Sequence, residues 1–155
     1  MMFHHLGIAT ESLEGDAQAY AALGYEPEGE EFTDPIQGVR GLFLGGGGPR
    51  LELLEPLPGS ETLAPLLRRG VKCYHHGYEV PSLGEGLAEL RGAGAQVVRP
   101  PAKAVAFDNR QVVFLMLPNM WMVELIEREP GQHADSHEPA PSGYAHRRGR
   151  AAQRA

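Results

Sequence analysis

The 155-residue chain contains only one cysteine and no long hydrophobic run, and each of these features excludes a class of protein. Cys73 alone cannot form an intrachain disulfide, so the fold does not depend on a disulfide framework. No apolar stretch approaches the ~20 residues of a membrane-spanning helix, and the N-terminus lacks the basic start and apolar core of a secretion signal. We therefore expect a cytoplasmic protein without a membrane partner.

Positive charge is scarce outside the C-terminal end of the chain. The whole sequence has 14 Lys and Arg against 20 Asp and Glu, a formal net charge of −6. Residues 128–155 hold five Arg and three acids, which leaves nine bases and 17 acids, a net −8, in residues 1–127. Because such a surface repels phosphate backbones, nucleic acid is not an expected partner.

Large apolar side chains are nearly absent after Glu127. Residues 128–155 contain no Leu, Ile or Val, one aromatic residue and three prolines. A segment of this composition cannot bury enough apolar surface to offset the entropy lost on ordering. We therefore expect one folded domain at residues 1–127 and a disordered tail at residues 128–155.

The folded part contains an internal repeat. MFHHLGIATESLEG aligns with CYHHGYEVPSLGEG at an offset of 70 residues, and GLFLGGGGPRLELLEP resembles VVFLMLPNMWMVELIE at an offset of 72. Two copies of this length indicate a duplicated module and not a solenoid. The aligned pairs are His5 with His75, Gly7 with Gly77, and Glu52 with Glu124.

Each copy begins with the pattern of a strand followed by a helix. Residues 3–9 and 73–80 have strand character, and Ser12 and Ser82 stand where helix N-caps belong. Helices of about three turns follow, and glycines at 24 and 94 end them.

Three further strands complete each copy. They are expected at residues 25–33, 38–45 and 50–55, and again at 95–98, 111–117 and 121–127. A short linking helix is expected at about residues 60–69. The sequence therefore predicts an α+β fold of two β-α-β-β-β modules, about 1–57 and 72–127. The modules form a concave mixed sheet with helices on its outer face.

Strand alternation selects four side chains that face away from the helices. His5 shares a side with Gly7, and Glu52 points opposite to its leucine neighbours, with the same relation in the second copy. An acid between apolar neighbours is costly to bury without a partner. Two imidazoles and two carboxylates suit one divalent metal ion, namely zinc, cobalt, nickel, iron or manganese. The predicted ligands are His5, Glu52, His75 and Glu124.

Neighbouring polar residues offer alternatives that the same alternation disfavours. His4 and His76 have the parity of the helix-facing positions, so we expect them to contact the helix layer. Glu55 and Glu127 end their strands and are expected to be exposed. Cys73 has the parity of the ligand side, but no adjacent groups suggest a catalytic thiol, so core packing is its expected role.

Four motifs in order, HLGIA, QGVRGLFLGGGGPRLELLEPL, HHGYEV and MVELIE, resemble the vicinal oxygen chelate superfamily, which includes glyoxalases, bleomycin-binding proteins and dioxygenases. The pattern is most similar to methylmalonyl-CoA epimerase-like proteins. The resemblance covers residues 3–127 and implies the same four metal ligands, with a homodimer expected. One departure is Ile36 in DPIQGV, where these epimerases commonly carry a glutamate regarded as an acid/base group.

The resemblance implies a metal-dependent isomerase, epimerase or glyoxalase-type lyase that transfers a proton next to a carbonyl. Glu124 is the expected base and Glu52 the second candidate. The substrate is expected to be a small carboxylate or an acyl-CoA. Asn109 and Arg110 are candidates to bind its carboxylate, although an exposed salt bridge would equally explain Arg110. The alternative functions are ligand sequestration without catalysis and, more weakly, a dioxygenase.

Overall fold

Two copies of one strand pattern lie side by side in the structure, a computed structural model that describes residues 1–128. Residues 129–155, which include nearly all of the predicted tail, lie outside the described part. The first copy contains β1 (Met2–Ala9), α1 (Leu13–Ala21), β2 (Glu26–Asp34), β3 (Val39–Gly45) and β4 (Leu51–Pro56). Helix α2 (Ala64–Arg68) follows, and the second copy contains β5 (Cys73–Val80), α3 (Leu83–Gly92), β6 (Gln96–Ala104), the 3-10 turn η1 (Val105–Phe107), β7 (Arg110–Met116) and β8 (Met122–Glu127).

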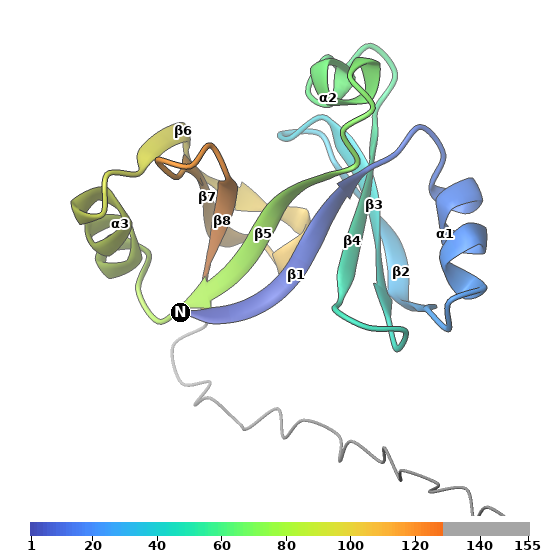
Figure 1. Ribbon diagram of the computed structural model, residues 1–155, viewed down its shortest axis with the longest axis horizontal. Helices are drawn as coiled ribbons and strands as arrows, with labels where there is room; N and C mark the ends of the chain where they lie inside the picture. The colour runs from blue at the N-terminus through green and yellow to red at the C-terminus, as the bar shows by residue number, and fades with distance from the viewer. Residues whose placement is uncertain (129–155) are drawn as a thin grey trace, which may run out of the picture.

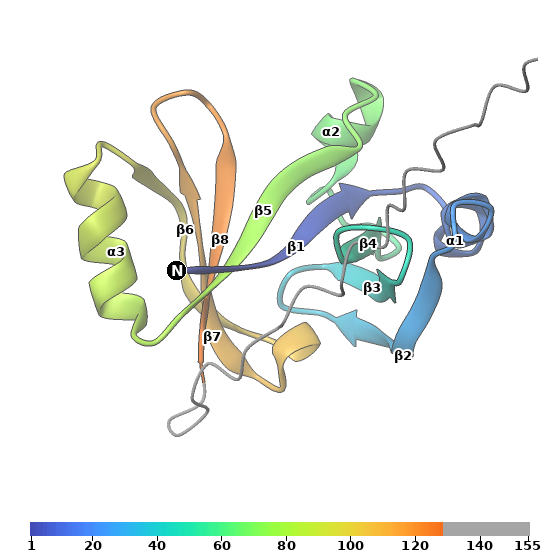
Figure 2. The same ribbon diagram turned by 60° about the horizontal axis from the view of Figure 1, so that its bottom comes forward.

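All eight strands form one mixed sheet in the order β2-β3-β4-β1-β5-β8-β7-β6. Strands β1 and β5 pair antiparallel at the centre, whereas β1 pairs with β4, and β5 with β8, in parallel. The sheet curls into a half-barrel, and α1 and α3 lie on its outer side at opposite flanks (Figures 1 and 2). The predicted α+β fold with a concave mixed sheet and outer helices is confirmed.

Each long helix packs its apolar side on the outer face of its own half of the sheet. The serines act as the predicted N-caps, because the Ser12 hydroxyl accepts from the Gly15 N–H and the Ser82 hydroxyl accepts from the Glu85 N–H. Two separate hydrophobic clusters result, one under each helix. Their most buried members are Leu13, Leu44 and Leu53 under α1, and Leu115, Leu125 and Val113 under α3.

Two glutamates that were expected to be exposed anchor these helices instead. The Glu55 carboxylate, at the end of β4, accepts a hydrogen bond of 2.9 Å from the Leu13 N–H. Glu127, at the end of β8, accepts one of 3.1 Å from the Leu83 N–H. A negative charge at a helix N-terminus satisfies a free N–H group and interacts favourably with the helix dipole. The expectation of exposure was therefore wrong for both.

Strand β6 extends well beyond the predicted residues 95–98. It runs to Ala104 and includes Pro100 and Pro101. Because β6 lies at the edge of the sheet, prolines are tolerated in it where they would disrupt a central strand. Among the described residues, no helix has the length and hydrophobicity needed to cross a membrane.

Candidate metal centre

The four predicted ligands meet at the middle of the concave face. His5 on β1 and His75 on β5 are 0% exposed, while Glu52 on β4 and Glu124 on β8 are 3% and 2% exposed. One ligand atom from each residue lies within 4.8 Å of the other three, so the group could hold a metal ion. The roles of the individual residues stay predictions.

The repeated glycines explain how the two imidazoles fit into the sheet. In the β1–β5 pair, Gly7 lies opposite His75 and Gly77 lies opposite His5. A Cβ atom on Gly7 would overlap the His75 ring, and one on Gly77 would overlap the His5 ring. Each histidine therefore lies over a position where only glycine leaves room, which accounts for the His-X-Gly pattern in both copies.

The separations between the four side chains fit a shared cation. The two histidine Nε2 atoms are 2.9 Å apart. Glu52 Oε2 lies 3.2 Å from His5 Nε2 and 3.5 Å from His75 Nε2, and the corresponding distances from Glu124 Oε2 are 3.4 and 3.7 Å. In a tetrahedral site with bonds of about 2.1 Å, ligand atoms lie about 3.4 Å from one another. Nitrogen and carboxylate donors in this proportion suit zinc and its first-row neighbours.

The electrostatics of the buried carboxylates also favour a cation. Burial, together with repulsion from Glu52, raises the pKa of Glu124 well above its ordinary value. Burial opposes ionisation of Glu52 as well, but the adjacent histidines outweigh it and lower the pKa of Glu52 to about 2. Of the four buried side-chain atoms without a hydrogen-bond partner among the described residues, two belong to this centre, namely His75 Nδ1 and Glu124 Oε2. A divalent ion would satisfy this glutamate oxygen and counter both carboxylates.

Two β-bulges add a second side chain beside each ligand histidine. The β1–β5 register shifts between Phe3 and His5, and again between Gly7 and Ile8, so that His4 and Tyr74 are the extra residues. The ring centres of His4 and His5 are 5.1 Å apart, and those of Tyr74 and His75 are 4.5 Å apart. A bulge breaks the simple alternation of a strand. The expectation that His4 contacts the helix layer was therefore wrong.

The His4 side chain lies between the predicted ligand His5 and the guanidinium group of Arg50. Its Nδ1 lies 2.8 Å from His5 Nδ1, and its Nε2 lies 2.8 Å from a guanidinium nitrogen of Arg50. Burial and the neighbouring His5 and Arg50 lower the pKa of His4 to about 3. A hydrogen bond to the second ring nitrogen fixes the orientation of a ligand histidine, so His4 positions His5.

Aromatic rings enclose the four polar side chains. Phe43 and Phe114 lie directly across from Glu52 and Glu124 on the neighbouring strands. Phe107, from η1, stacks on the His5 ring with centres 5.8 Å apart.

The turn η1 is held over the concave face by the buried Asp34 on the opposite edge strand. One Asp34 oxygen accepts from the Val105 N–H, and the other accepts from the N–H groups of Ile36 and Gln37. Sequence reasoning missed Asp34 because its partner Val105 is 71 positions away.

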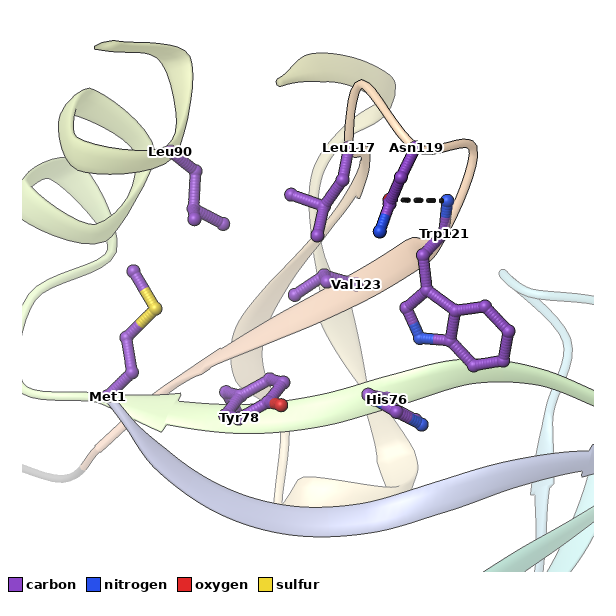
Figure 3. A pocket seen from close by; sticks show the side chains of 8 residues that line it. All are labelled: Met1, His76, Tyr78, Leu90, Leu117, Asn119, Trp121 and Val123. Carbon is purple, nitrogen blue, oxygen red and sulfur yellow. Dashed lines mark hydrogen bonds between the residues drawn. The ribbon is translucent and has the colours of Figure 1, made fainter. Parts of the chain in front are cut away.

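His76 faces away from the metal centre, as its parity predicted. It lines an outer hollow of about 540 Å³ beside α3, with its ring centre 4.7 Å from that of Trp121. Figure 3 shows the two side chains together with Tyr78 and Leu90 at this hollow. Cys73 packs in the cluster under α1, the core role expected for it.

The remaining predicted site residues lie at the border of the concave face. An Arg110 guanidinium nitrogen lies 2.9 Å from Glu79 Oε1, and Nε donates to the Phe107 carbonyl. Asn109 is exposed and adopts a positive φ of 61°. Their binding of a substrate carboxylate stays a prediction. Ile36 is 68% exposed in the turn between β2 and β3.

Comparison with known proteins identifies the family of this chain. The sequence profile of the glyoxalase/bleomycin resistance protein/dioxygenase superfamily matches residues 4–114. The chain belongs to this superfamily. It is 30% identical, over 72% of its length and 85% of the relative's, to a protein of Cereibacter sphaeroides named ethylmalonyl-CoA/methylmalonyl-CoA epimerase. The predicted family is confirmed.

Two solved structures are similar to this fold. A methylmalonyl-CoA epimerase from Mycobacterium tuberculosis is 26% identical with a TM-score of 0.68, over 83% of this chain and 89% of the other. A hypothetical protein from Bacillus halodurans is 27% identical with a TM-score of 0.71, over 84% and 96%. Both matches extend over most of the described part of the chain.

Proposed function

We propose that this family member is a metal-dependent epimerase that moves a proton at the carbon next to a thioester carbonyl. The observation that carries the proposal is the buried set of two imidazoles and two carboxylates. Relatives at 30% and 26% identity are named as epimerases of methylmalonyl-CoA, which favours this chemistry over other reactions of the superfamily. The proposed substrate is an acyl-CoA or the related carboxylic acid.

The chain's own donors define what a bound ion would do. His5, Glu52, His75 and Glu124 would hold one divalent ion, with zinc, cobalt, nickel, iron and manganese as the candidates. Bound by these residues, such an ion would polarise a carbonyl oxygen and stabilise negative charge on it when the adjacent carbon loses a proton. The rings of Phe43 and Phe114 limit the access of water to these groups, which strengthens electrostatic interactions among them.

Glu124 is the proposed group that takes the proton from the substrate. Its Oε2 is the oxygen that faces the two histidines and would bind the ion, so the second oxygen of this carboxylate is the one proposed to accept the proton. Glu52 is the second candidate, and its Oε2 is held more closely by the two histidines. The two carboxylates come from opposite halves of the sheet. This placement suits an epimerisation, because the proton leaves one side of the carbon and returns to the other side. Ile36 has no ionisable group, so neither proposed proton transfer involves the turn that contains it.

Hydrogen exchange tests this function directly. Metal-loaded protein is incubated in deuterated water with methylmalonyl-CoA and a panel of 2-oxo and 3-oxo acids, and deuterium at the α-carbon is followed by mass spectrometry. Glu124→Gln should slow exchange at least ~100-fold, the usual contribution of a general base. Glu11→Gln, at an exposed position outside the site, should leave the rate unchanged.

The same assay separates the alternatives. Tight ligand binding with no exchange and no dependence on metal would overturn the proposal and favour a sequestration protein. Exchange that is equal in the parent and in Glu124→Gln would show that another group moves the proton.

A homodimer is proposed from the outer face of the central strands. Phe3 is 44% exposed there and contacts His76 and Tyr78 edge to face, with ring centres 6.1 and 5.8 Å away. An exposed apolar side chain packed on two half-buried rings forms the kind of surface that protein–protein contacts cover. Sedimentation at micromolar concentration should give the mass of two chains, which Phe3→Ser should reduce. A monomer at all concentrations would contradict this proposal.

A further inference from the structure

A cavity of about 250 Å³ lies next to the metal centre, between α2 and the second half of the sheet. Two of its lining residues touch a predicted ligand. The ring centre of His75 is 4.5 Å from that of Tyr74 and 5.4 Å from that of Phe114. The other lining residues are largely apolar, with Leu63 and Met122 among them. A molecule in this cavity would therefore lie one side chain away from His75, one of the four predicted donors.

Arg99 is the charged side chain that lines this cavity. It lies opposite Phe114 in the β6–β7 pair, and directly opposed residues project from the same face of a sheet. The register shifts on both sides of Arg99, which is the arrangement that re-aims a side chain next to a site. The geometry therefore places a guanidinium at the border of the concave face.

The Arg99 guanidinium has no acidic partner among the described residues. Arg50 pairs with Glu28 at 2.6 Å and Arg110 pairs with Glu79 at 2.9 Å, but Arg99 forms no ion pair there. The cavity thus combines an apolar wall with a guanidinium that forms no ion pair among the described residues.

We propose that Arg99 binds the carboxylate of the substrate and so selects acyl thioesters that carry a free acid. This inference rests on the proposed function, because it assigns a substrate class to the same site. A planar guanidinium matches a carboxylate with two parallel hydrogen bonds. The cavity is smaller than the ~300–1,000 Å³ of pockets for drug-sized ligands. It therefore suits a short acyl group whose carrier stays outside.

Kinetics on three thioesters test this assignment. These are methylmalonyl-CoA, propionyl-CoA with the same carrier but no carboxylate, and a short phosphate-free thioester of methylmalonic acid. Arg99→Ala should raise KM about tenfold for both carboxylated substrates and leave kcat and propionyl-CoA exchange unchanged. Arg99→Lys should recover part of the loss, because it keeps the charge but not the paired hydrogen bonds. Arg91→Ala, an exposed cation on α3, is the matched control.

Two results would overturn the assignment. Equal weakening of both CoA substrates, with no change for the phosphate-free thioester, would show that Arg99 binds a carrier phosphate. Unchanged KM for all three would show that it binds neither group, although the proposed function would stand if exchange still depended on metal.

If the parent protein exchanges no substrate, the proposed function fails and a binding measurement still decides on Arg99. The dissociation constant of methylmalonate with metal-loaded protein should then rise about tenfold in Arg99→Ala and not in Arg91→Ala. Equal affinities would overturn the assignment.

Discussion

Adding one methyl group at Gly7 or Gly77 should disable the metal centre without touching a ligand. The new Cβ in Gly7→Ala overlaps the His75 ring, and in Gly77→Ala it overlaps the His5 ring. Both rings are fully buried, so neither can move without disturbing its neighbours. Overpacking of this kind costs about 1–3 kcal/mol of folding stability. Loss of a group that only orients a ligand weakens metal binding ~10–100-fold. Displacement of the ligand itself should therefore weaken metal binding at least as much.

Metal titration and urea denaturation of each variant give both numbers. Gly92→Ala is the matched control, since a Cβ there meets no atom within 4 Å and alanine is the better helix former. Its stability and metal affinity should equal or exceed those of the parent. If Gly7→Ala and Gly77→Ala bind metal as tightly as Gly92→Ala, the reason given for the His-X-Gly pattern is wrong.

Three further changes test the supports of the site. Asp34→Ala leaves three backbone N–H groups without their acceptor and should lower the free energy of unfolding by about 2–4 kcal/mol in urea titration. Glu127→Ala should cost about 1 kcal/mol in the same assay, and the exposed Glu89→Ala should cost almost nothing. The pKa of His4 is about 3 in the fold against an ordinary 6.5, so stability should decline as pH falls through this interval. In metal-free buffer, the free energy of unfolding of His4→Gln should depend less on pH in this interval, by the contribution of up to one proton. An unchanged result for Asp34→Ala, Glu127→Ala or His4→Gln would contradict the contact concerned.

The repeat made much of the centre predictable from sequence. Each strand alternates faces, and each copy places one histidine and one glutamate on the side away from its helix. Because a histidine and a glutamate recur at equivalent positions in both copies, the four residues could be selected without knowledge of how the strands pair. They are His5, Glu52, His75 and Glu124. The structure then brings them within 4.8 Å of one another.

Features that depend on pairing between distant strands could not be predicted in this way. The bulges at His4 and Tyr74 arise only when β1 meets β5, and they turn both side chains toward the centre against simple alternation. The contacts of Glu55 and Glu127 with helix N-termini span more than 40 positions. Arg99 follows no local motif, and its place beside the cavity depends on its register with β7.

Metal content after purification without chelators tests the central claim most directly. Elemental analysis by mass spectrometry should find about one divalent ion per chain. His75→Ala and Glu124→Ala should bind far less, while His76→Ala, whose side chain lines the outer hollow, should retain the full amount. A parent protein that binds no divalent ion even after loading, or a His75→Ala variant that retains all of it, would contradict the assignment of His5, Glu52, His75 and Glu124 as a metal centre.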